Sequence, residues 1–126
     1  MESTVSIDQF QEELQSWKHE LSSFKQEIRH FEKHLEELSV RKLPKDLLAQ
    51  VEHFQNSFIC QKEVIDKLRH DLPDSRHKME NIFKSIGFKR TDHEGSVIHD
   101  TLRERMDTFR KLYDEVKEDF DRFKSE

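Results

Sequence analysis

Apolar residues recur at alternating spacings of four and three between residues 6 and 39. They are Phe10, Leu14, Trp17, Leu21, Phe24, Ile28, Phe31, Leu35 and Leu38. This heptad spacing places one apolar stripe along a helix of about 34 residues, which is about 50 Å long at 1.5 Å per residue. A single helix cannot bury such a stripe by itself, so the pattern predicts partner helices.

A second stripe follows Pro44, a residue that suits the first turn of a helix. Its members are Val51, Phe54, Phe58, Ile65, Leu68 and Leu72, with Gln61 as a polar interruption. Pro73 removes a backbone donor and clashes with the preceding turn, so it predicts a kink or a break. The apolar phase continues beyond it, and we therefore expect a helix over 44–72 that continues or restarts over 74–87.

The third stripe consists of Leu102, Met106, Phe109, Tyr113, Val116, Phe120 and Phe123. Its helix has two candidate starts, at residue 92 or residue 96, and is expected to end near residue 124. His99 falls on the same stripe. It is either a buried polar residue that fixes register or a fraying residue of the first turn, and we favour the second interpretation.

Charged residues beside the stripes predict how the helices are arranged. In parallel helices the g position of one helix faces the e position of the other, about five residues further along. The acidic g positions of the first helix then pair with basic e positions of the third, as Glu13 with Arg103, Glu20 with Arg110 and Glu27 with Lys117. This pairing requires the first and third helices to be parallel.

No ion pairs of this kind are expected between the first and second helices, because Lys18 and Lys25 would face Gln55 and Lys62. The short connection at Pro44 nevertheless predicts that these two helices are antiparallel. The sequence therefore predicts an all-α fold: an elongated, antiparallel, up-down-up three-helix bundle or coiled coil, formed by residues 1–126 as one domain.

The first helix, with Phe10-x3-Leu14-x2-Trp17 on its stripe, resembles the first helix of a spectrin-type repeat. The resemblance is one of architecture, and it implies a bundle of three helices. The third helix departs from that pattern because it has no second tryptophan.

Composition narrows the classes of function. Charged residues make up 39% of the chain and apolar residues 33%, and the net charge of −5 argues against binding to nucleic acid or to an anionic membrane. No stretch approaches the ~20 apolar residues of a membrane span, and the N-terminus lacks the features of a signal peptide. With a single cysteine, Cys60, an inert surface thiol is expected, and the predicted location is cytoplasmic.

The sequence contains none of the common motifs that indicate catalysis. The chain contains no glycine-rich phosphate loop, no Gly-x-Ser-x-Gly turn and no Cys-x-x-Cys pair. We therefore expect a non-enzymatic interaction, adaptor or structural module without a cofactor. Its expected partner is another protein or a second copy of the chain in a homodimer.

The middle segment is about ten residues longer than its neighbours and offers a candidate partner surface. If residues 79–88 project beyond the bundle, they expose five apolar side chains: Met79, Ile82, Phe83, Ile86 and Phe88. Exposed apolar surface of this kind typically marks a partner site. In the alternative, Pro73 folds the surplus back and the same residues are ordinary core.

A metal-binding bundle with a ferritin-like or hemerythrin-like role is the alternative function. Glu27-x-x-His30 matches an element of di-iron bundles, and His34 follows one turn later. These side chains fall on the rim or outside the apolar stripe, and the second helix has no matching element. No metal is therefore expected at Glu27, His30 and His34.

Overall fold

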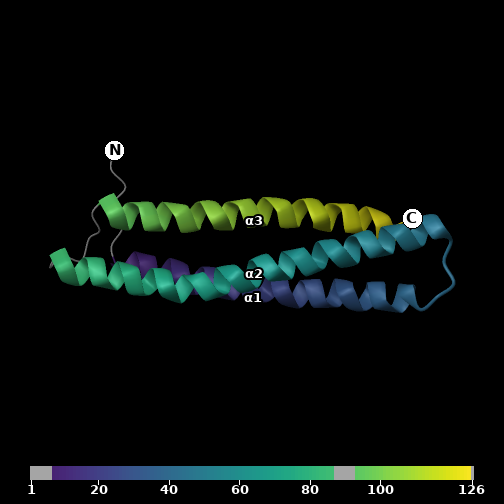
Figure 1. The fold of residues 1–126 in the computed structure, drawn as a ribbon, viewed down its shortest axis with the longest axis horizontal. Coiled ribbons are helices and arrows are strands. Elements are labelled where there is room, and N and C mark those ends of the chain that lie inside the picture. Colours follow the sequence, from purple (N-terminus) through teal and green to yellow (C-terminus); the bar gives the residue numbers. More distant parts are fainter. Residues whose placement is uncertain (1–6, 87–92, 126) are drawn as a thin grey trace.

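The computed structural model describes residues 7–86 and 93–125, which form three helices and no strand. The helices are α1 (Ile7–Ser39), α2 (Lys45–Ile86) and α3 (His93–Ser125). α2 returns alongside α1 in the opposite direction, and α3 runs parallel to α1 (Figure 1). The predicted all-α, up-down-up three-helix bundle is therefore confirmed.

The apolar stripes of the three helices face one another and form one continuous core. One part of this core is an aromatic cluster made of Phe31, Phe54, Phe58, Phe120 and Phe123. Phe120 lies at the centre of the cluster, with ring centroids 5.0 Å from Phe31 and 5.3 Å from both Phe54 and Phe58. Since these rings come from all three helices, the cluster joins the whole bundle at one level.

The three predicted ion pairs between α1 and α3 are all present. Arg110 donates two hydrogen bonds to the Glu20 carboxylate, of 2.6 Å from Nε and 2.7 Å from Nη2. The outer pairs are Arg103 with Glu13 at 3.5 Å and Lys117 with Glu27 at 3.2 Å. The same offset of 90 residues recurs in each pair, which confirms the parallel register derived from the heptad positions.

Exchange of one pair of charges tests this register. Arg110→Glu is expected to lower the free energy of unfolding by about 1 kcal/mol, because it places two carboxylates together at a partly exposed contact. Adding Glu20→Arg should restore most of the loss. Urea titrations of both single variants and the double variant measure the coupling. A double variant no more stable than the sum of its single changes would contradict the pairing.

Charged contacts also join α1 to α2, contrary to the expectation from the sequence. Lys25 donates to Asp66 at 2.6 Å, and Lys62 lies 2.9 Å from Glu32. The expectation was wrong because it considered only one register position, whereas each lysine reaches a carboxylate at a neighbouring position. Both pairs support the antiparallel packing of the two helices.

α2 is continuous through Pro73 and has 42 residues, whereas α1 and α3 have 33 each. Of the two expected alternatives at Pro73, a helix that continues and a helix that restarts, the structure shows the first, and the surplus does not fold back. Figure 1 instead shows one uninterrupted ribbon that changes direction along its length and extends past the start of α1. Pro73 has no N–H, so the carbonyl of Arg69 lacks its usual helical donor.

Candidate functional site

The predicted partner surface at 79–88 is only partly accessible. Met79 has 0% of its surface exposed and Phe83 only 6%, and both belong to the core, while Ile82 is half-buried. Of the two alternatives for this segment, an exposed surface is wrong for Met79 and Phe83, and core is right. They reach the core because the unbroken helix carries the apolar phase of α2 past Pro73, and not because the segment folds back. The side chain of Ile86 and all of Phe88 lie outside the described residues.

His99 is buried, with 2% of its surface exposed. Its ring stacks on Trp17 at 6.2 Å and meets Phe10 edge-on at 5.8 Å, and its Nε2 lies 3.0 Å from Glu13 Oε2. Its Nδ1 is buried and makes no hydrogen bond with any described residue. The fraying interpretation is therefore wrong, and His99 is a polar residue within the α1–α3 contact, where such residues typically fix register.

The predicted alternative metal ligands do not come together. The Glu27 carboxylate accepts a hydrogen bond from the hydroxyl of Tyr113 and also pairs with Lys117. Burial, followed by this hydrogen bond, raises the pKa of Tyr113. His30 is exposed, and the ring of His34 lies against Phe120 at 6.2 Å. Within the described ranges, Glu27, His30 and His34 do not form a group with converging ligand atoms.

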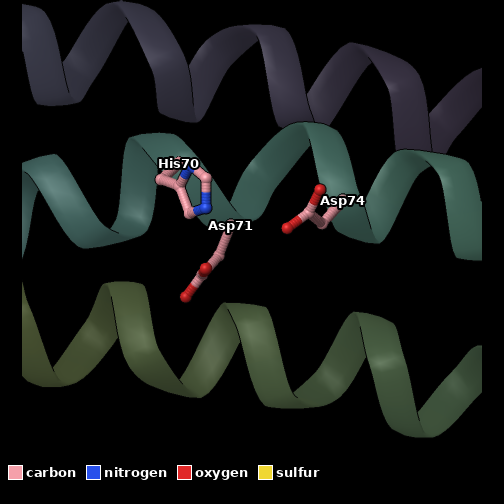
Figure 2. Close-up of side chains that lie close together, drawn as sticks. All are labelled: His70, Asp71 and Asp74. Atoms are coloured by element: carbon pink, nitrogen blue, oxygen red, sulfur yellow. The ribbon is translucent and has the colours of Figure 1, made fainter.

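A different set of possible ligands converges on α2. One candidate ligand atom from each of His70, Asp71 and Asp74 lies within 4.8 Å of the other two. Figure 2 shows the three side chains on neighbouring turns, with Asp71 directed towards α3. His70 and Asp74 are exposed, and Asp71 is partly buried.

Asp71 also joins α2 to α3. Arg105 Nη2 donates to Asp71 Oδ2 at 2.8 Å, and Lys67 Nζ lies 3.8 Å from the same oxygen. The hydrogen bond from Arg105 is the main cause that holds the pKa of the Asp71 carboxyl below its ordinary value. The side chain is therefore a carboxylate at neutral pH.

An apolar groove of about 460 Å³ lies between α2 and α3, beside this ion pair. Val64 lies seven residues before Asp71 on α2, and Leu112 lies seven residues after Arg105 on α3. Both line the groove, and 44% of Val64 and 48% of Leu112 remain exposed. An apolar pair thus replaces an ion pair at the outer edge of the α2–α3 contact.

The floor of this groove includes the buried side chains of Leu68 and Phe109. Gln61 also lines it, and the Gln61 Oε1 atom is buried without a hydrogen-bond partner among the described residues. Buried polar atoms without a hydrogen-bond partner are uncommon in folded proteins, because burial removes their hydrogen bonds to water. Together these residues define what we call the α2–α3 groove.

A second groove, of about 740 Å³, lies between α1 and α2 near Pro73. Its lining is more polar and includes Lys18, Arg69 and Arg76. Cys60 is an exposed free cysteine, in agreement with its predicted surface position. These features add no converging catalytic groups within the part of the chain that the structure describes.

Comparison with known proteins yields no matching family model, no matching curated protein and no matching solved structure. None of the described helices has an apolar stretch suited to crossing a bilayer.

Proposed function

We propose that this chain is a non-enzymatic helical interaction module that associates with a second copy of itself through the α2–α3 groove. The observation that carries the proposal is the exposed apolar pair Val64 and Leu112 over an apolar floor. A polar or charged pair is the usual occupant of such edge positions in a self-contained bundle. Apolar residues there favour burial by further helices.

Charge complementarity favours a second copy as the occupant. Glu63 on α2 and Lys111 on α3 immediately precede the apolar pair, and both are exposed. A two-fold axis parallel to the bundle places α2 of one copy opposite α3 of the other. Glu63 of each copy then faces Lys111 of the other copy, which gives two equivalent pairs of opposite charge.

Substitution of the apolar pair tests the association. The wild-type chain is expected to have the mass of a dimer by light scattering and analytical ultracentrifugation at micromolar concentrations. Val64→Glu with Leu112→Glu should weaken the dimer at least tenfold, because association would bury the new charges. Both side chains are about half exposed, so the helicity of each chain should change little.

Ile59 supplies the matched control, because it is equally exposed on α2 but does not line the groove. Ile59→Glu is expected to leave the mass unchanged. Glu63→Lys should weaken the dimer, and Glu63→Lys with Lys111→Glu should restore it. A wild-type monomer at several hundred micromolar, or a dimer that Ile59→Glu disrupts equally, would overturn the proposal.

A further inference from the structure

The side chains of His70, Asp71 and Asp74 on α2 form a cluster outside the α2–α3 groove. His70 and Asp74 are four residues apart and therefore lie one above the other on the same helix face. Asp71 is adjacent to His70, and the nearest ligand atoms of the three side chains are mutually within 4.8 Å (Figure 2). One imidazole and two carboxylates thus converge on two neighbouring turns of α2.

Arg105 gives this set a supporting contact from α3. It donates to Asp71 Oδ2, and the nearby Lys67 approaches the same oxygen. A carboxylate has two oxygens, so Asp71 can present Oδ1 to a ligand while Oδ2 keeps its contact with Arg105. Carboxylates that bind metals are typically oriented by an outer hydrogen bond of this kind.

The donor types select the class of ligand. Imidazole suits zinc and its neighbours in the first transition series, whereas magnesium and calcium prefer oxygen ligands alone. Two carboxylates attract a divalent cation, although Arg105 and Lys67 already offset part of the charge of Asp71. Three protein ligands with one water complete the four-coordinate geometry that zinc favours in open sites.

We propose that His70, Asp71 and Asp74 form a binding site for one zinc ion on α2. Ligand atoms around tetrahedral zinc are about 3.4 Å apart, given bond lengths of about 2.0–2.2 Å. Side chains within 4.8 Å reach this spacing by rotation. The exposure of His70 and Asp74 leaves them free to rotate, and Asp71 stays anchored by Arg105. The site does not depend on association through the α2–α3 groove.

Calorimetric titration of the full chain with zinc chloride at neutral pH tests the site. The expected result is one ion per chain, with His70→Ala and Asp74→Asn each raising the dissociation constant at least tenfold. Circular dichroism should show unchanged helicity, because both residues are exposed. Magnesium at the same concentration should not compete, since imidazole is a poor ligand for it.

His34→Ala is the matched control, because His30 and His34 also lie one turn apart on a helix and form the main competing pair of imidazoles. This variant should retain the wild-type affinity at the α2 site. Three results would overturn the proposal. They are no zinc binding by the wild-type chain, equal competition by magnesium, or binding that depends on His34 and persists in His70→Ala.

Discussion

Phe120→Ala is expected to lower the free energy of unfolding by about 3–5 kcal/mol, which is a large share of the roughly 5–15 kcal/mol that stabilises a typical domain. The change leaves a cavity where rings from α1, α2 and α3 meet. Neighbouring rings cannot collapse into it easily, because they are held on three helices that pack against one another along their whole length. Urea unfolding followed by circular dichroism measures the loss.

Ile59→Ala provides the control for this change, since it truncates a half-exposed side chain on α2. Its expected effect is within about 0.5 kcal/mol of zero, as for most surface substitutions. A loss below about 1 kcal/mol in Phe120→Ala would show that the three helices do not depend on the aromatic cluster for their packing.

Pro73→Ala is expected to raise the free energy of unfolding by about 2 kcal/mol. Proline in a helix interior is about 3 kcal/mol less favourable than alanine, and alanine also restores an N–H donor for the Arg69 carbonyl. The greater freedom of the unfolded chain offsets about 0.4–1 kcal/mol of the gain. Pro73 is exposed, so the change leaves no cavity in the core.

Thermal unfolding and amide exchange over residues 69–77 measure the effect of Pro73→Ala. Asn81→Ala is the matched control on the same helix, with an expected gain of no more than about 0.7 kcal/mol from helix propensity alone. If Pro73→Ala destabilises the chain, the change of direction in α2 is required for packing against α1 and α3.

The fold was largely predictable because each helix carries a complete heptad stripe. The positions of Glu20 and Arg110 beside their stripes were sufficient to predict the register of α1 and α3, and the ion pair confirms it. Pro73 was harder to interpret. Local chemistry opposes a helix there, but continuous packing of Leu72 and Met79 on the same stripe overrides it.

The candidate sites were less accessible to sequence reasoning. His99 was assigned to a frayed turn because its place between Trp17 and Phe10 depends on the approach of α1 and α3. Its hydrogen-bond partner Glu13 is 86 residues away in the sequence. Val64 and Leu112 occupy edge positions, which a search for stripes passes over. A comparison of edge positions across antiparallel helices, heptad by heptad, is the signal that would have revealed them.

The ligand set on α2 had a local signal, namely a histidine followed four residues later by an aspartate. That spacing is common on exposed helices, so it carries little weight without a third ligand atom nearby. The convergence of Asp71 depends on its side-chain direction, which Arg105 on α3 fixes. Only the assembled bundle therefore distinguishes His70 and Asp74 from other exposed pairs.

The constant offset of 90 residues between Glu13 and Arg103, Glu20 and Arg110, and Glu27 and Lys117 restricts how the length of this protein can change. Deleting seven residues from α1 alone would separate pairs that now match. Deleting seven at the same height from all three helices keeps every stripe in phase. Each such block spans about 10 Å. Shorter or longer versions of the bundle should therefore differ by whole multiples of that distance.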